Sequence, residues 1–441
     1  MSSLNEKSLN YNSEVKINFE GGDLTSDSGA LLYGMFNEKL GVSAVIEETF
    51  NTDKTITHRK HNDAEVILQS IYQDICGYDT DDSADELRHD KALKTILKKD
   101  VLASQPTISR VNNRATTDSI KQLQTINYKL RDRVYEINMP SEVILDADST
   151  DAIAYGKQQG SKFNGHYRTN GFHPLLIFDC NTQDLIKATL RPGNVYTSRK
   201  IVEFTGPILK DYKSRYPKIK LKFRADSGFA TPELYKLCET HKTEYAIRLK
   251  SNATLIKKST ELSEELLNNC KDNMIDYAVI YGEFKYKANS WDKERRVVVK
   301  IEKPAGQMTL VHMFVVTSME SAAEEVIGFY CDRGEMENFI KECKNGFDLC
   351  KMSSTSYIAN AMKLQRKALA YNINNWFRRL VLPSVYKGMR IETIRVKLIK
   401  VAAKIVKHSR YIHFKLNSTY PYKELFIDTF KNIKSLACLR I

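Results

Sequence analysis

The sequence predicts an α/β protein, because patterns typical of strands and of helices follow one another through its middle third. The clearest strand pattern is EVILDADS at 142–149, an apolar run that ends in acidic residues. HPLLIFDC at 173–180 and LIKATLRPG at 185–193 flank a polar turn, as the strands of a hairpin do. Helix patterns (198–215, 231–242) then alternate with strand patterns (219–228, 244–250). The order β-β-β-α-β-α-β is the one that an RNase H-like (retroviral integrase-like) core requires.

The regions around this core have other patterns. Helical periodicity predominates before it, after a short strand-like VKINF, and includes one long helical run at 83–99. Strand-like runs follow the core with few helical signals, which predicts a β-rich insertion; helical periodicity then returns and ends at Pro383. We expect five segments: a mostly helical region at 1–138, the first part of the core at 139–250, the β-rich insertion at 251–320, core helices at 321–383 and a basic C-terminal segment at 384–441.

Basic residues are in excess and unevenly placed. Lys and Arg outnumber Asp and Glu by 67 to 54, giving a net charge of +13. This favours a polyanionic partner such as nucleic acid, although simple solubility is the alternative. From 384 to 441, thirteen cations face three acids. Within this segment, 394–416 mixes bases with apolar residues and fits an amphipathic helix, for which membrane-surface binding is the less favoured interpretation.

The cysteines and the apolar stretches exclude several classes of protein. The eight cysteines form no C-x-x-C pair, so neither a zinc knuckle nor a disulfide framework is indicated. No apolar run reaches the roughly 20 residues needed to span a bilayer, and the N-terminus lacks a signal-peptide core. We therefore expect a soluble cytoplasmic protein with no membrane partner.

A candidate DNA-binding motif lies at 102–123. A turn and a Ser104 cap precede Pro106, and the following helix would display Arg110 and Arg114, side chains suited to phosphates and base edges. We interpret this segment as a helix-turn-helix and expect the 1–138 region to bind DNA. An ordinary capped surface helix is an equally good interpretation.

Two acids end neighbouring strands of the predicted sheet. Asp148 ends the first strand and Asp226 the fourth, in FRADSGFA, and in open α/β sheets ligands lie beyond the carboxyl ends of the strands. Adjacent carboxylates repel each other unless divalent cations neutralise them. Mg²⁺ takes oxygen ligands, so a third carboxylate would complete a two-ion site for phosphoryl transfer. Asp146 shares the strand face of Asp148 and is a competing ligand.

The third acid is expected in YCDRGEMENFIKECK. On one continuous helix, Tyr330, Arg333, Glu337 and Lys344 would fall within roughly 60° of one face. That face would carry an aromatic hydroxyl, two cations and an acid. The alternative is a solvated helix in which Glu337 pairs with Lys341; Glu335 and Glu342 are competing acids on other faces.

These residues resemble a known family. The spacing Tyr-x2-Arg-x3-Glu-x6-Lys at 330–344 is similar to the signature of a group of bacterial insertion-sequence DDE transposases. LDADST and RADSGFA look like the IS-thirteen-eighty branch, which is related to the IS-four group. The resemblance runs from about Val15 to about Leu416.

The resemblance implies a function and a set of site residues. Asp148, Asp226 and Glu337 would be the catalytic acids that hold two Mg²⁺ or Mn²⁺ ions, and Tyr330, Arg333 and Lys344 would contact the phosphates of the transposon end. The implied activity is cut-and-paste transposition: cleavage of double-stranded DNA at the element's own terminal inverted repeats, then strand transfer into target DNA. Such enzymes act as homodimers assembled on paired ends, and this one would act at the bacterial nucleoid.

Trp291 and a glycine-rich stretch at 156–171 are further candidates for DNA contacts. Relatives with this signature form DNA hairpins, which need an unstacked base held by an aromatic side chain. Trp291 is a candidate for that role, although a core tryptophan is the better default. The glycine-rich stretch at 156–171 carries Lys157, Lys162, His166 and Arg168 beside the first acidic strand and could touch phosphates. A plain solvated connection is at least as good an interpretation.

Two other functions remain open. One is a metal-dependent DNA nuclease that cuts without strand transfer. The other is a non-catalytic DNA-binding regulator derived from a transposase. The presence of three acids with the complete Tyr-Arg-Glu-Lys set argues against the regulator, because drift would be free to remove any of them.

Overall fold

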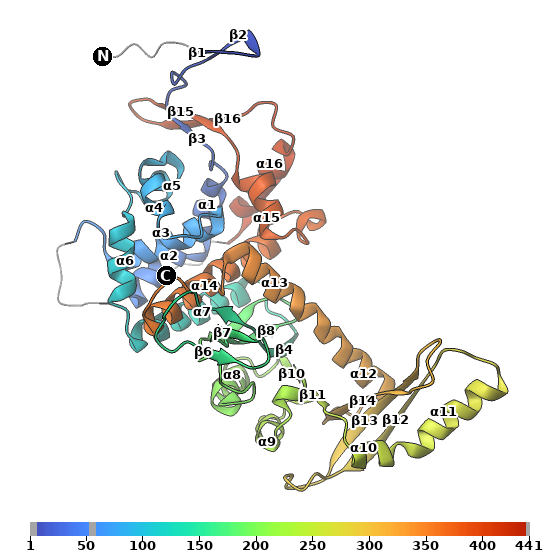
Figure 1. The fold of residues 1–441 in the computed structure, drawn as a ribbon. Coiled ribbons are helices and arrows are strands. Elements are labelled where there is room, and N and C mark those ends of the chain that lie inside the picture. The colour runs from blue at the N-terminus through green and yellow to red at the C-terminus, as the bar shows by residue number, and fades with distance from the viewer. Residues whose placement is uncertain (1–6, 53–58, 438–441) are drawn as a thin grey trace. The chain divides into compact units, whose positions relative to one another are not determined.

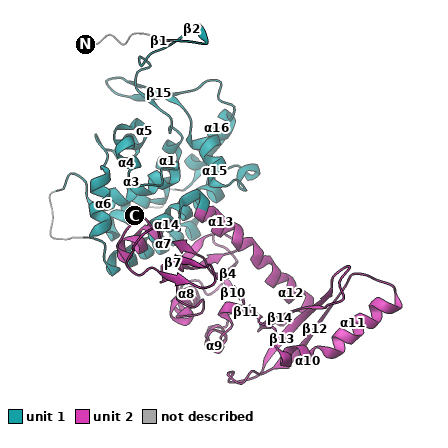
Figure 2. Ribbon diagram, viewed as in Figure 1, with its two compact units in different colours: residues 1–137, 345–349, 365–441 teal, residues 138–344, 350–364 magenta. Residues whose placement is uncertain are grey.

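The structure, a computed structural model, describes residues 7–52 and 59–437. The chain forms two compact units, coloured separately in Figure 2. No helix in the described ranges is both long and apolar enough to cross a bilayer. Unit 1 consists of residues 1–137, 345–349 and 365–441, and unit 2 of residues 138–344 and 350–364. The finer division into five segments stays a prediction.

Unit 1 is mostly helical (Figure 1). Its core includes the second half of the long helix α14 (Tyr357–Val381), where Tyr371, Trp376 and Phe377 are buried. The ring of Tyr33 stacks on Phe377 with the ring centroids 4.0 Å apart. The other helices are α1 (Ala30–Leu40), α2 (Val42–Thr49), α3 (Asp63–Cys76), α4 (Ser83–Glu86), α5 (Lys91–Leu97), α6 (Gln105–Asn113), α7 (Thr117–Ile137), α15 (Ile391–Ile394) and α16 (Lys423–Ser435).

The strands of unit 1 form two small sheets. A hairpin pairs β1 (Lys7–Leu9) with β2 (Asn12–Ile17). A second sheet pairs β3 (Leu24–Thr25) with β15 (Ala403–Lys407), which also pairs with β16 (Ile412–Leu416). A π-helical turn, η5 (Arg395–Ile399), precedes β15.

A buried ion cluster joins α3 to α14 within unit 1. Arg366 donates from Nε to the Asp74 carboxylate at 3.0 Å, and Lys367 lies 3.5 Å from the same carboxylate. Arg395 donates to the main-chain carbonyls of Asp74 and Ile75 in the last turn of α3, where carbonyl groups lack the usual partners of a helix interior. The buried charges of Asp74, Arg366 and Lys367 are therefore paired with one another.

Unit 2 is built on one mixed sheet of eight strands in the order β12-β13-β14-β11-β10-β4-β8-β9. β4, β10 and β11 are parallel to one another, and the other pairings are antiparallel. The strands are β4 (Glu142–Ser149), β8 (Leu175–Asp179), β9 (Leu185–Thr189), β10 (Lys220–Ala225), β11 (Glu244–Leu249), β12 (Ala278–Tyr286), β13 (Arg295–Lys303) and β14 (Val311–Thr317). A small separate sheet contains β5 (Ala152–Ile153), β7 (Thr169–Phe172) and β6 (Lys162–Asn164).

Helices cover both faces of the β12–β14 end of the sheet. Val326 and Ile327 of α12 (Ala323–Cys331) pack on buried residues of β11, β13 and β14, with Tyr281 of β12 against the same cluster. Gly282 points to the opposite face, where an added Cβ would lie 2.3 Å from Leu262 of α11 (Thr260–Asp272). The glycine therefore lets α11 approach the sheet closely. The remaining helices of unit 2 are α8 (Ile201–Arg215), α9 (Pro232–Thr240), α10 (Ala253–Lys258) and α13 (Met336–Phe347), which ends in unit 1.

The core strands agree with the sequence prediction, but two stretches with a helical pattern are not continuous helices. The 251–320 segment contains the strands β12, β13 and β14, which continue the main sheet through β14 and β11, and also the helices α10 and α11. The 83–99 run is broken at Asp90, whose side chain caps α5 by accepting from Leu93 N at 2.8 Å. The segment from 330 to 344 is interrupted by a 3-10 turn, η3 (Asp332–Glu335), so the predicted single helix is two.

The predicted amphipathic helix at 394–416 is instead the hairpin β15–β16 after a short π-helical turn. In β16, IHFKL alternates apolar and polar residues with a period of two, and in β15, AKIVK contains the adjacent β-branched residues Ile405 and Val406. A period of two fits a strand, whereas a buried helical face needs a period of 3.6.

The ion cluster of unit 1 gives a first prediction. Arg366→Met leaves the buried Asp74 carboxylate without its main partner, so we expect a loss of about 3 to 5 kcal/mol in the free energy of unfolding. Urea unfolding of the whole protein measures this loss of free energy. In Arg366→Met/Asp74→Asn we expect part of this loss to be recovered, as coupled sites require. A loss in the double variant equal to the sum of the losses in Arg366→Met and in Asp74→Asn would show that the two side chains are not coupled.

Candidate active site

Two acids meet at the carboxyl ends of β4 and β10. The register pairs Asp146 with Arg224 and Ala147 with Ala225, so Asp148 and Asp226 occupy the next position on adjacent parallel strands. Asp226 turns the chain after its strand, accepting from Gly228 N at 2.8 Å. Burial raises the pKa of Asp148, and the carboxylate of Asp226 adds to this effect. The strand pairing thus holds two carboxylates together against their repulsion.

Arg333 neutralises this pair of acids. Its Nη2 lies 2.9 Å from the Asp148 carboxylate and 3.3 Å from the Ala147 carbonyl. Burial alone would lower the pKa of Arg333, but Asp148 and Asp226 together raise it. In the part of the chain that the structure describes, its buried Nε has no hydrogen-bond acceptor. The guanidinium therefore keeps donor capacity for an anion.

Two other residues of the predicted set lie near the acids. Tyr330 ends the buried face of α12, where burial raises the pKa of its hydroxyl and Asp226 adds to the effect. Lys344, on α13, lies 2.6 Å from the Asp151 carboxylate and 3.3 Å from the Thr150 hydroxyl. Arg333 and Lys344, the two cations of the predicted helix face, therefore contact acids at or just after the end of β4.

Glu337 is not gathered with the two aspartates. Its side chain is 65% exposed, and Lys341 lies 4.0 Å away. Over residues 7–52 and 59–437, no group of three His, Cys, Asp or Glu side chains is placed to share a metal ion. Of the competing acids, Glu335 is exposed and Glu342 is buried. The structure therefore brings together two of the three predicted acids.

Asp146 has a different environment from Asp148. Arg224 donates to both of its carboxylate oxygens at 2.7 Å, and both side chains are almost fully buried. The Phe329 ring covers the guanidinium at 4.8 Å. Burial raises the pKa of Asp146, and Arg224 opposes that rise. With both oxygens occupied and no access to solvent, Asp146 is a structural acid in this conformation, whereas 20% of Asp148 is exposed.

One further aromatic side chain near the acids had no signal in the sequence. Tyr167, in the turn between β6 and β7, donates its hydroxyl to the Ser149 carbonyl at 3.5 Å. Burial, together with the charges of Asp148, Asp151 and Asp226, raises the pKa of Tyr167 to about 12. This turn belongs to the glycine-rich stretch at 156–171, which was expected beside the first acidic strand. The sequence therefore predicted the position of the stretch but gave no reason to select Tyr167. Lys157, Lys162 and Arg168 of that stretch are exposed.

The other predicted DNA contacts have mixed positions. Arg110, on α6, is exposed. Arg114 follows α6 and is 2.7 Å from the Asp63 carboxylate, so it is engaged within unit 1. Trp291 is 7% exposed and packs edge-on against Tyr235 and Tyr286, which favours the core interpretation over base stacking.

The different environments of Asp146 and Asp148 give a second prediction, for the metal-free protein. Asp146→Asn leaves the Arg224 charge buried without its carboxylate, and we expect a loss of about 3 kcal/mol in the free energy of unfolding. Asp148→Asn removes one of two adjacent carboxylates as well as the partner of Arg333, so we expect a change within about 1 kcal/mol. Urea denaturation measures both. A large loss in Asp148→Asn would instead place that acid among the structural residues.

Known proteins similar to this chain are transposases. Among solved structures, the chain is similar to the piggyBac transposase in a cryo-EM synaptic complex with hairpin DNA, at 13% identity and a TM-score of 0.45, over 95% of this chain and 86% of that one. It also matches the Mos1 transposase in a paired-end complex with the left transposon end, at 13% identity and a TM-score of 0.18, over 51% of this chain and 73% of that one. No curated protein matches the sequence. A family described as transposase DDE domain group 1 matches residues 7–438, so the chain belongs to the DDE transposases.

Proposed function

We propose that this protein is a cut-and-paste DNA transposase, cleaving double-stranded DNA at the terminal inverted repeats of its own element and joining the freed ends to target DNA. The observation that carries the proposal is the convergence of Asp148, Asp226 and Arg333 at one edge of the sheet of a DDE transposase. The strand order β9-β8-β4-β10-β11, with β8 antiparallel to β4, supports an RNase H-like core. The narrower IS-thirteen-eighty assignment belongs to this proposal.

The donor set fits divalent metal ions of the Mg²⁺ or Mn²⁺ kind. Asp148 and Asp226 offer hard oxygen ligands at adjacent strand ends, and their mutual repulsion is the cost that a cation removes. Glu337 is the third ligand in this proposal. When bound, two ions lower the pKa of water and stabilise the leaving oxygen in phosphodiester cleavage.

The chain's own residues bind and orient the DNA. Arg333, now paired with Asp148, has an unused Nε donor and can exchange the carboxylate for a phosphate. Lys344 can make the same exchange from Asp151, and Tyr330 supplies a hydroxyl beside Asp226. Arg110, exposed on α6, is the better placed of the two helix-turn-helix arginines. A homodimer assembled on paired ends completes the proposal.

The role of Glu337 gives a third prediction. Glu337→Gln removes a metal ligand while keeping the shape of the side chain, so we expect DNA cleavage to fall by about a thousandfold or more while end binding stays within a few-fold. Cleavage is measured on the DNA segment that flanks the gene, with Mg²⁺, with Mn²⁺ and with EDTA.

Glu335→Gln is the matched control, because Glu335 is an exposed acid two residues away. We expect it to cleave normally. If Glu335→Gln were inactive and Glu337→Gln active, the third ligand would have to be reassigned. Loss of binding as large as the loss of cleavage would contradict a metal-ligand role. Cleavage without joining of 3′ ends to a target plasmid would favour the nuclease, and DNA binding without metal-dependent cleavage would favour the regulator.

The phosphate contact of Arg333 gives a fourth prediction. Arg333→Ala should weaken end binding and lower the slope of log affinity against log salt by about 0.9, since one phosphate contact is lost. Fluorescence anisotropy in EDTA between 50 and 200 mM salt, about the range over which such contacts weaken, measures the slope. Arg333→Lys keeps the charge and should keep most of the slope. An unchanged slope in Arg333→Ala would contradict the contact.

A further inference from the structure

The hairpin β15–β16 carries cations that the proposed active site does not use. From 393 to 423 the sequence contains no Asp or Glu. Lys404, Lys407, Arg410 and Lys415 are all exposed. In the described ranges, none of these four side chains forms an ion pair with an acid. The hairpin therefore presents charge that unit 1 itself leaves uncompensated.

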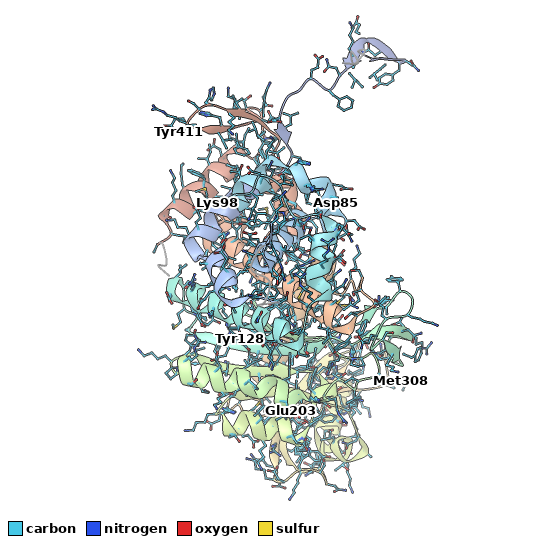
Figure 3. The ribbon with its side chains drawn as sticks, turned by 90° about the vertical axis from the view of Figure 1, so that its left-hand side faces the viewer. Asp85, Lys98, Tyr128, Glu203, Met308 and Tyr411 are labelled. Carbon is cyan, nitrogen blue, oxygen red and sulfur yellow. The ribbon has the colours of Figure 1, made fainter. Side chains whose placement is uncertain are left out.

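The register places this charge and several rings on one face. Lys404 lies directly opposite Lys415, and Val406 opposite His413. Strand alternation puts His408 and Tyr411 on that same face, where the His408 and His413 rings are 5.3 Å apart and the Tyr411 and His413 rings 6.2 Å apart. Figure 3 shows Tyr411 at the end of the projecting hairpin. We name this surface, made of Lys404, His408, Tyr411, His413 and Lys415, the ribbon face.

The opposed lysines are unfavourable in the free protein. Like charges directly opposite each other on a sheet destabilise it, and no acid lies between them in sequence. A polyanion bound to this face removes the repulsion. A lysine on an edge strand also blocks edge-to-edge pairing. In the sheet order β16-β15-β3, however, only Lys415 lies on an edge strand, so edge protection accounts neither for Lys404 nor for an arginine in the turn.

The dimensions and chemistry of the ribbon face fit duplex DNA. The four steps of extended chain from Lys404 to His408 span roughly 13 Å. A two-stranded ribbon enters a major groove about 12 Å wide, and lysine and arginine side chains bind phosphates on its borders. Tyr411, with 67% of its surface exposed, adds an aromatic contact at the tip.

We propose that the β15–β16 hairpin is a DNA-binding ribbon, separate from the residues assigned to the catalytic site, that holds duplex DNA through phosphate contacts of Lys404, Arg410 and Lys415. The proposal rests on the proposed function, because a transposase must hold DNA along a length greater than the bond it cuts. The contacts are to the phosphate backbone, so they are independent of DNA sequence.

The test compares two variants that each lose three positive charges. The hairpin variant is Lys404→Gln/Arg410→Gln/Lys415→Gln. The control variant is Lys210→Gln/Lys218→Gln/Lys236→Gln, which removes exposed cations from α8, α9 and the chain between α8 and β10. Binding to a duplex of unrelated sequence and about 30 base pairs is followed by fluorescence anisotropy at several salt concentrations. We expect the hairpin variant to bind about tenfold or more weakly, with a salt slope lower by about 2.7, and the control to stay within about twofold.

Each other outcome decides between explanations. Equal effects in the two variants, or an unchanged hairpin variant, would overturn the ribbon. Self-association of the hairpin variant in size-exclusion chromatography, with unchanged DNA affinity, would assign the lysines to edge protection. If the triple variant were misfolded by circular dichroism, Arg410→Gln alone decides the question, because Arg410 lies outside both strands; a slope lower by about 0.9 is expected and an unchanged slope refutes the ribbon.

Metal-dependent cleavage by the same wild-type preparation separates this proposal from the proposed function. Wild-type protein that binds and cuts DNA, together with an unaffected hairpin variant, would refute the ribbon alone. Wild-type protein that binds no duplex would refute both.

Discussion

The parallel pairing of β4 with β10 is the constraint on which the chemistry of unit 2 depends. Because the register sets Asp146 opposite Arg224, it also sets Asp148 beside Asp226 at the edge where both strands end. Two carboxylates in a partly buried place repel each other, and the sheet cannot relax this without losing its hydrogen bonds. Arg333 supplies the compensating charge in the metal-free chain. The pairing of β4 with β10 therefore holds two carboxylates and the cation that compensates them at one edge of the sheet.

Asp146 and Asp148 show how depth along one strand separates two identical side chains. They lie two residues apart and on the same face of β4, yet Phe329 and Arg224 seal the first from water while the second is partly exposed. The inner acid, with Arg224, ties β4 to β10 and to the Phe329 carbonyl in α12. The outer acid also has both oxygens engaged, by Ser149 N and Arg333, but 20% of its side chain is exposed. The two acids that end the apolar run at 142–149 thus have different roles: Asp146 holds the core together through Arg224, and Asp148 is the candidate ligand.

The sequence predicted those parts of the molecule in which local pattern and tertiary packing agree. β4 has the predicted bounds, and β8, β9, β10 and β11 differ from theirs by a few residues, because each is an apolar run bounded by turn residues. The α11 helix was missed because only two of its residues, Leu266 and Cys270, are buried, which gives a weak apolar stripe. The hairpin at 403–416 was mistaken for a helix because its basic and apolar residues were assigned the wrong period. Asp148, Asp226 and Arg333 could be named from strand ends and spacing, but Tyr167 could not, since only tertiary structure brings its turn to the acids.

The 3-10 turn between α12 and α13 explains why Glu337 stands apart. A 3-10 helix turns by about 120° per residue and an α-helix by about 100°, so the four residues of η3 rotate the start of α13 by roughly 80° relative to one continuous helix. Glu337 comes almost directly after that turn, whereas Lys344 has a longer side chain and still reaches Asp151. A third carboxylate beside Asp148 and Asp226 would add repulsion in the absence of metal, so electrostatics favours the separated position that Glu337 has in the structure.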